Sequence, residues 1–263
     1  MTPDAVFVQD GDVFHATDLA LGPWQPGALH GGAPAALIVH AITAHPVADG
    51  LQLARITYEF VRPVPQHGLT VSVQVVRPGR RVTLLDAVLH DGDGVEVTRA
   101  RALLLQPSEV SAAPREPPPF PGPEQGIRSD WEKNRPRMFA TEGMQILFVK
   151  GQFLSPGDAT AWFRLRYPLV AGQPTHPLEQ MAAAGDFGNG ISAVLDWDRY
   201  MFINPDLTVI IERPPVDEWV ALESHTRVER GSAGVSESVM WDRAGRIGRA
   251  IQSLLVVPRP PAT

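Results

Sequence analysis

The chain has 263 residues, a formal net charge of −6, 44% hydrophobic and 20% charged residues, which is typical of one or two packed domains rather than of a disordered chain. It contains no cysteine, which excludes disulfides, thiolate metal ligands and a cysteine nucleophile. The acidic balance argues against a nucleic-acid partner, and we expect a cytoplasmic protein without membrane insertion because neither a leader nor a long apolar stretch is present.

The first element expected is a helix within residues 27–45, GALHGGAPAALIVHAITAH. Its apolar residues lie nearly all round, which indicates a buried helix rather than an amphipathic one. His30, Gly31 and Gly32 precede it. Glycines there allow a ligand to approach the backbone, and free amides at a helix start can polarise a carbonyl. A plain helix start with packing glycines explains the same residues equally well.

Strand-like runs follow the helix. Apolar and polar residues alternate from Leu69 to Val75, and the HDGDG segment at residues 90–94 predicts a hairpin between two β-rich runs.

The second half of the chain repeats the first. Residues 55–105 and 206–256 both begin with a β-rich run ending in Arg-Pro, pass an Asp and a turn glycine, and close with an apolar strand. Two copies are too few for a solenoid, so each copy is a domain or half-domain. Three pairs of landmarks share an offset of 151 residues: Arg62 and Arg213, Asp91 and Asp242, Gly94 and Gly245. The same offset makes Arg101 the counterpart of Gln252.

A proline-rich segment separates the two copies. We predict an N-terminal unit at 1–106, a linker at 107–125 and a C-terminal unit at 126–263, because the linker carries seven prolines. The second helix is expected to begin near Pro177 and to end by residues 188–190. A buried helix wrapped by an antiparallel sheet, twice over, predicts an α+β double hotdog fold with grooves between the paired units.

The usual catalytic signatures are missing from the sequence. It has no G-x-S-x-G elbow, no H-E-x-x-H pair, no Walker A loop and no G-x-G-x-x-G. We therefore expect no metal and no cofactor. Thioester hydrolysis remains available, since it needs a water, a carboxylate and donors for the oxyanion.

Three polar residues could serve that chemistry. Asp186 lies near the end of the second helix, Gln252 lies in an apolar strand, and Asn204 precedes a proline. A turn role for Asp186 and Asn204 and a solvent-facing role for Gln252 are the simpler interpretations of the pattern.

At these residues the sequence resembles the acyl-CoA thioesterase II family and its double-hotdog relatives. The resemblance rests on PGALHGGAPAALI, GDFGNG, FINPDLTVIIERPP, EWVALES and AIQSLLV. That family holds its attacking water with Asp, Gln and Thr. The resemblance assigns the Asp to Asp186 and the Gln to Gln252, and it places Asn204 where the family has threonine. Thr208 is the weaker candidate for that role.

The predicted function is hydrolysis of a fatty or related acyl-CoA, in lipid metabolism, by a homo-oligomer. Asp186 would be the general base, Gln252 and Asn204 would position water, and His30, Gly31 and Gly32 would bind the thioester carbonyl. Two alternatives stay open: a hotdog enoyl-CoA hydratase or dehydratase that uses His30 with Asp186, and a non-catalytic acyl-CoA-binding module.

Overall fold

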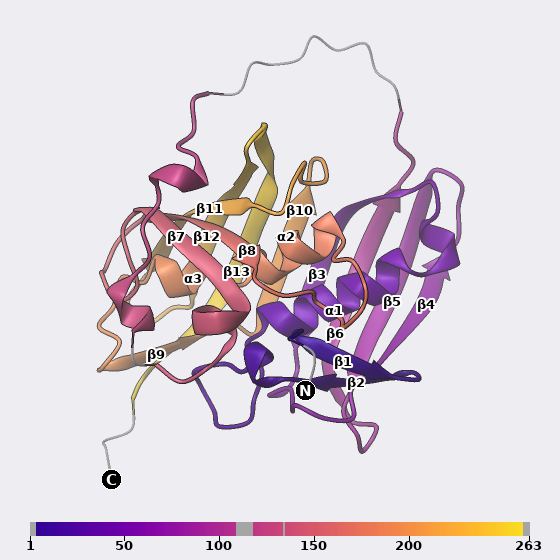
Figure 1. The fold of residues 1–263 in the computed structure, drawn as a ribbon, viewed down its shortest axis with the longest axis horizontal. Coiled ribbons are helices and arrows are strands. Elements are labelled where there is room, and N and C mark those ends of the chain that lie inside the picture. Colours follow the sequence, from indigo (N-terminus) through magenta and orange to yellow (C-terminus); the bar gives the residue numbers. More distant parts are fainter. Residues whose placement is uncertain (1–3, 109–117, 134, 260–263) are drawn as a thin grey trace.

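The computed structural model describes residues 4–108, 118–133 and 135–259. Within them, one large antiparallel sheet runs across the molecule in the order β4-β5-β6-β3-β10-β13-β12-β11-β8-β7, with β9 paired to β13 (Figure 1). Its strands are β3 (Gln52–Phe60), β4 (Thr70–Arg77), β5 (Val82–His90), β6 (Glu96–Leu105), β7 (Met144–Lys150), β8 (Ala159–Leu165), β9 (Tyr200–Ile203), β10 (Asp206–Ile211), β11 (Val220–Val228), β12 (Gly234–Asp242) and β13 (Gly245–Pro258).

A small hairpin precedes the first unit's helix as β7 and β8 precede the helix of the second. It consists of β1 (Phe7–Asp10) and β2 (Val13–Ala16), and Phe14 bridges to Leu69 just before β4. Single helical turns complete the chain at Asp18–Ala20, Pro46–Ala48, Pro123–Gln125, Asp130–Glu132 and Phe139–Gly143.

The two units meet where β3 pairs with β10. Thr57 lies opposite Thr208, its counterpart in the repeat, and their hydroxyl oxygens are 3.1 Å apart. This contact between equivalent residues marks a local two-fold relation between the units. Four strands, β3 to β6, belong to the first unit and the rest of the large sheet to the second.

Helix α1 (Gly32–Thr43) is buried along nearly its whole length, as its apolar composition predicts. Helix α2 (Pro177–Gly185) begins with a capping box, in which His176 accepts from the Leu178 amide and Glu179 accepts from the His176 amide. The helices pack antiparallel. His40 Nδ1 lies 2.8 Å from Glu179 Oε1 near one end of the pair.

The second helix begins and ends within the predicted bounds, but a further helical turn that was not predicted follows it. Helix α2 ends at Gly185, and residues Gly188–Ile191 form a separate helical turn, α3, where the sequence predicts only the helix end. Glycine at the start of α3 allows a close approach to the sheet, because a Cβ on Gly188 would lie 2.8 Å from Ser238 Oγ and 2.9 Å from Gln252 Oε1 and would displace these side chains. The turn therefore sits directly on the inner face of the sheet.

The offset of 151 residues does not extend through the last strand. Asp91 and Val95 close the first hairpin around three residues, whereas Asp242 and Gly245 close the second around two. The counterpart of Gln252 is therefore Ala102, which pairs with Leu85 as Gln252 pairs with Ser236. Arg101, the counterpart by simple counting, is exposed and binds Asp86.

Residues 109–117 of the predicted linker lie outside the described residues. Its last part packs against the second unit: the Phe120 ring stacks on Trp241 at 4.5 Å, and Trp162 Nε1 donates to the Pro121 carbonyl at 2.8 Å. These contacts form an apolar cluster separate from the main core.

Candidate active site

Asp186 follows α2 directly and is the residue around which the site is built. Its residue exposure is 7%, so its carboxylate is almost wholly removed from solvent. Asn204 Nδ2 donates to Oδ1 at 2.8 Å, and Gln252 Nε2 donates to the same oxygen at 3.2 Å. Buried carboxylates require such donors. Both amide side chains thus hold one oxygen of Asp186, while Oδ2 faces α1.

The start of α1 supplies the other wall of the carboxylate's surroundings. His30 Nδ1 lies 3.1 Å from Asp186 Oδ2 and 3.1 Å from the Gly32 amide nitrogen. One ring nitrogen cannot donate to the carboxylate and accept from the amide at once. A Cβ on Gly31 would lie 2.8 Å from Asp186 Oδ2, so glycine is needed for the carboxylate's close approach.

Gly32 has a packing role in the structure. A Cβ there would lie 2.5 Å from the Ala183 carbonyl oxygen, so glycine lets α1 and α2 meet closely.

Gln252 is 1% exposed and points inward from β13. Its Oε1 accepts from the Asn189 backbone amide at 3.1 Å, which leaves Nε2 to face Asp186. A solvent-facing glutamine, the simpler interpretation of the sequence, is therefore wrong.

Asn204 lies between β9 and β10 and also donates to the Asp206 carbonyl at 3.1 Å. Thr208, the alternative to Asn204, instead contacts Thr57 at the junction of the units. The structure thus brings Asp186, Asn204, Gln252 and His30 together from distant parts of the chain.

A cavity of about 420 Å³ opens beside this cluster. Asp186, His30 and Asn204 line it, so the carboxylate and two of its partners reach ligand-accessible space. Gln252 lies behind them, bonded to the carboxylate. A carboxylate at the base of a cavity of this size fits a hydrolytic site for a small-molecule substrate.

The cavity has features that the sequence pattern did not reveal. Its remaining wall includes several aromatic side chains: the Trp24 and Trp197 rings stack at 5.4 Å, and Trp131 packs on Phe153 at 4.6 Å. Arg135, whose guanidinium lies 5.1 Å from the Trp131 ring centre, and Arg259 also line it. These residues carry no common motif and come from segments separated in the chain.

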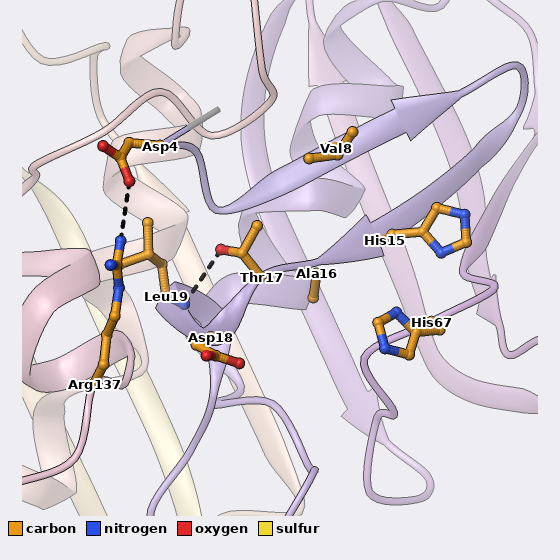
Figure 2. Close-up of a pocket in the computed structure, with 9 residues that line it drawn as sticks. All are labelled: Asp4, Val8, His15, Ala16, Thr17, Asp18, Leu19, His67 and Arg137. Atoms are coloured by element: carbon orange, nitrogen blue, oxygen red, sulfur yellow. Dashed lines mark hydrogen bonds and ion pairs between the residues drawn. The ribbon is translucent and has the colours of Figure 1, made fainter. Parts of the chain in front are cut away.

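A larger depression of about 550 Å³ lies elsewhere, beside the N-terminal hairpin (Figure 2). His15 and His67 face one another there with ring centres 5.8 Å apart, and Arg137 pairs with Asp4 at 3.1 Å. Its wall contains none of the predicted site residues, so the smaller cavity is the better candidate.

The described part of the chain contains neither a cluster of metal-ligating side chains nor a helix that could span a membrane. Its His, Asp and Glu side chains do not gather in any group of three that could hold a metal ion. None of its helices has the length and apolar character needed to cross a membrane.

Comparisons with known families match both units. A family model for the acyl-CoA thioesterase N-terminal domain matches residues 20–105, and one for the C-terminal domain matches residues 107–256. The chain belongs to the acyl-CoA thioesterase family. The family predicted from the sequence is thereby confirmed, and membership supports a thioester hydrolase. No curated protein sequence matches the chain.

Solved structures support the fold. A hot dog fold protein of unknown function from Alicyclobacillus acidocaldarius has a TM-score of 0.71 at 18% identity, over 97% of this chain and 96% of its own. The tesB protein of Mycobacterium avium subsp. paratuberculosis (TM-score 0.65, 16% identity) and the acyl-CoA thioesterase II TesB2 of Mycobacterium marinum (0.64, 13%) each align over 97% of this thioesterase-family chain and 96% of their own. The predicted double hotdog fold is confirmed.

Proposed function

We propose that this protein hydrolyses acyl-CoA thioesters to a free acid and CoA, with Asp186 as the general base. The observation that supports the proposal is a buried carboxylate that both lines the cavity and is held by two amide side chains at 2.8 and 3.2 Å. Family membership supports the thioester, and the carboxylate supports a hydrolytic route without a covalent intermediate.

In the proposed reaction, a water bound in the cavity gives one proton to Asp186 while its oxygen attacks the thioester carbonyl carbon. The carbonyl electron pair moves onto its oxygen and forms a tetrahedral intermediate. The pair then returns, the carbon–sulfur bond breaks, and the leaving CoA thiolate takes the proton from Asp186, which restores the base and leaves the free acid. Thiolates are good leaving groups, so one positioned base is sufficient for this sequence.

For Gln252 and Asn204 we propose a role beside the water positioning predicted from the sequence. In the described structure both amides bind the carboxylate rather than standing free for water, so we propose that they act by orienting Asp186. Holding Oδ1 with two donors leaves Oδ2 as the proton acceptor. Positioning of this kind contributes to rate because the base meets the water in one geometry.

The cavity wall offers contacts for both parts of an acyl-CoA. The guanidinium groups of Arg135 and Arg259 suit the phosphates of CoA, since guanidinium binds phosphate through paired donors. The aromatic side chains suit a flat or apolar acyl group. Arg80 and Arg81, which are exposed in the turn between β4 and β5, are not among the cavity residues.

The decisive experiment compares Asp186→Asn with the native enzyme for thiol release across a panel of acyl-CoA substrates. The substitution keeps the shape and removes the base, so kcat should fall by about 10²–10⁴-fold. Asp91→Asn, in an exposed hairpin turn, is the matched control and should keep native activity. A folded Asp186→Asn protein with full activity would remove Asp186 from the mechanism.

A second candidate function is favoured by one observation. His30 Nδ1 lies 3.1 Å from Asp186 Oδ2, a histidine–carboxylate pair of the kind that adds water across an enoyl-CoA double bond. Incubation with an enoyl-CoA separates the candidates: loss of enoyl absorbance without thiol release supports hydration. Thiol release with no hydrated product supports the thioesterase.

A further inference from the structure

Asn189 is a polar residue of the cavity to which the family resemblance assigns no role. It lies in α3, is 5% exposed and forms part of the cavity wall with Asp186 and Asn204. Its backbone amide donates to Gln252 Oε1 at 3.1 Å, and Gln252 in turn donates to Asp186. Asn189 is therefore one residue away from the base through a continuous set of hydrogen bonds.

The side-chain amide of Asn189 has no hydrogen-bond partner for Nδ2 within the described residues. Buried amide donors in proteins are nearly always paired, because an unpaired donor has lost its hydration without compensation. Since no bond fixes the terminal amide, it can rotate by 180° and exchange its oxygen and nitrogen. In the orientation of the structure Nδ2 is itself buried, so the donor reaches the cavity only when the amide turns, and its partner then comes from a ligand or a solvent molecule.

The other amide side chains near the base are already committed. Asn204 donates to Asp186 and to the Asp206 carbonyl, and Gln252 donates to Asp186. The Trp197 indole nitrogen in the cavity wall also lacks a partner within the described chain, but no hydrogen bond connects Trp197 to Asp186. Asn189 is thus the better placed donor for an atom next to the attacked carbon.

The backbone amide of Gly32, a donor predicted from the sequence, points to His30 Nδ1 at 3.1 Å. This amide is engaged within the protein when His30 Nδ1 is the acceptor, and Nδ1 then does not donate to Asp186. A side-chain donor from the second unit would take the role that the sequence assigns to the first helix.

We propose that the Asn189 side-chain amide donates a hydrogen bond to the thioester carbonyl oxygen and stabilises the negative charge that the oxygen acquires. This inference rests on the proposed function, since it assigns a catalytic residue to the same reaction. The water proton still goes to Asp186, and the sulfur still leaves as thiolate. The bond from Asn189 strengthens as the carbonyl oxygen becomes an oxyanion, so its effect falls on kcat.

The test measures kcat and KM for thiol release in Asn189→Ala and in Asn189→Asp, which keeps the size of the side chain. We expect kcat to fall by about 10²–10³-fold in both, the usual effect of losing one oxyanion donor, with KM within a few-fold of native. Ser192→Ala is the control on α3. It removes the hydroxyl bonds to the Gly188 carbonyl and to Thr226, both 2.8 Å, without touching the cavity, and should leave kcat within a few-fold.

A second readout does not depend on turnover. An acyl-CoA ketone analogue, with a methylene between sulfur and carbonyl, binds but cannot be cleaved. Its carbonyl infrared band should lie at lower frequency in the native and Asp186→Asn proteins than in Asn189→Ala. The inference would be overturned if Asn189→Ala kept native kcat and showed the carbonyl band at the native frequency while Asp186→Asn was inactive. The proposed function would then still stand. Full activity in Asp186→Asn would overturn the proposed function instead.

Discussion

The two units present opposite chemistry on equivalent positions of the sheet's inner face. The strand registers match position by position: Thr226 pairs with Ser236 as Val75 pairs with Leu85, and Ser236 pairs with Gln252 as Leu85 pairs with Ala102. The first unit is apolar and the second polar at five such positions: Val73, Val75, Leu85, Ala87 and Ala102 against Ser224, Thr226, Ser236, Ser238 and Gln252.

The equivalent faces of the two units therefore serve different purposes, one in the core and one around Asp186. In the first unit these side chains pack against the long buried helix α1 and contribute to the core. In the second unit α2 stops at Gly185, and the polar face lies beneath α3 and beside Asp186. The polar face is largely satisfied internally, since Ser224 bonds Ser238 at 2.7 Å and Thr226 bonds Ser192 at 2.8 Å.

The largest expected contrast is between Leu85→Ala and Ser236→Ala. Leu85 is fully buried in the core, so its truncation should lower the free energy of unfolding by about 2–5 kcal/mol. Ser236 occupies the equivalent position, but its hydroxyl has no partner within the described residues. Its removal should change stability by less than about 1 kcal/mol. Chemical denaturation measures both, and equal losses would contradict the proposed division between the units.

Gln252→Ala tests whether activity depends on the polar face of the second unit. The substitution installs the first unit's residue, alanine, and removes the donor to Asp186 and the acceptor for the Asn189 amide. We expect kcat for thiol release to fall by about 10²-fold, as for other positioning groups. Ser253→Ala, next in the strand and bonded to Asp206 on the exposed side, is the control. Native kcat in Gln252→Ala would show that Asp186 needs no orienting amide.

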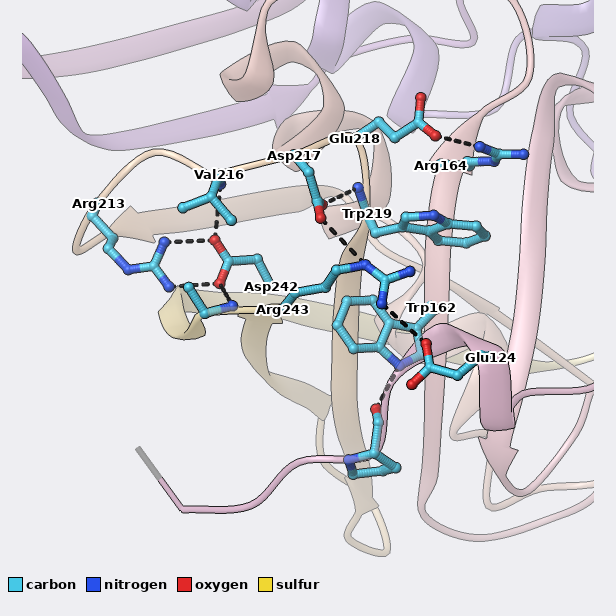
Figure 3. A network of polar contacts seen from close by, with 12 residues as sticks. Glu124, Trp162, Arg164, Arg213, Val216, Asp217, Glu218, Trp219, Asp242 and Arg243 are labelled. Atoms are coloured by element: carbon cyan, nitrogen blue, oxygen red, sulfur yellow. Dashed lines mark hydrogen bonds and ion pairs between the residues drawn. The ribbon is translucent and has the colours of Figure 1, made fainter. Parts of the chain in front are cut away.

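A smaller effect is expected where the two hairpins differ. Asp242 is buried and receives two short bonds from Arg213, at 2.5 and 2.6 Å, and bonds from the Val216 and Ala244 amides (Figure 3). Burial raises the pKa of the Asp242 carboxyl, but the bonds from Arg213 and the two amides outweigh it, so the pKa lies below its ordinary value of 3.8. Its counterpart Asp91 is half-buried, and its carboxylate accepts hydrogen bonds from the amides of Asp93 and Val95 within its own turn.

Asp242→Asn should therefore destabilise the protein by about 1–3 kcal/mol at neutral pH, whereas Asp91→Asn should cost less than about 0.5 kcal/mol. Because the folded-state pKa of Asp242 is depressed, its contribution is present above the pKa of the unfolded chain, near 3.9, and is lost as the pH falls through the lower folded value. Unfolding curves between pH 7 and pH 3 test this. A difference between native and Asp242→Asn that does not shrink toward pH 3 would contradict the assignment.

Much of the architecture was predictable from local pattern. The apolar character of α1, the proline at the start of α2 and the turn residues near Asp91 act over a few positions, so their consequences can be read along the chain. The repeat predicted two equivalent units, and the family resemblance pointed to Asp186, Gln252 and Asn204. Local pattern favoured a turn for Asp186 and solvent for Gln252, because it contains no information on what lies across the sheet.

By itself the sequence determined the composition, the buried helix, the alternating strands and the duplication, since these depend on neighbours in the chain. Only the tertiary structure decided that His30 meets Asp186, that both amides bind the carboxylate, and that Asn189 joins them through Gln252. It also decided that Gln252 is equivalent to Ala102. The second hairpin is shorter by one residue, so a constant offset along the sequence assigns each later residue of β13 to a position on the opposite face of the sheet. Side chains far apart in sequence become neighbours through packing and strand pairing, which no local pattern specifies.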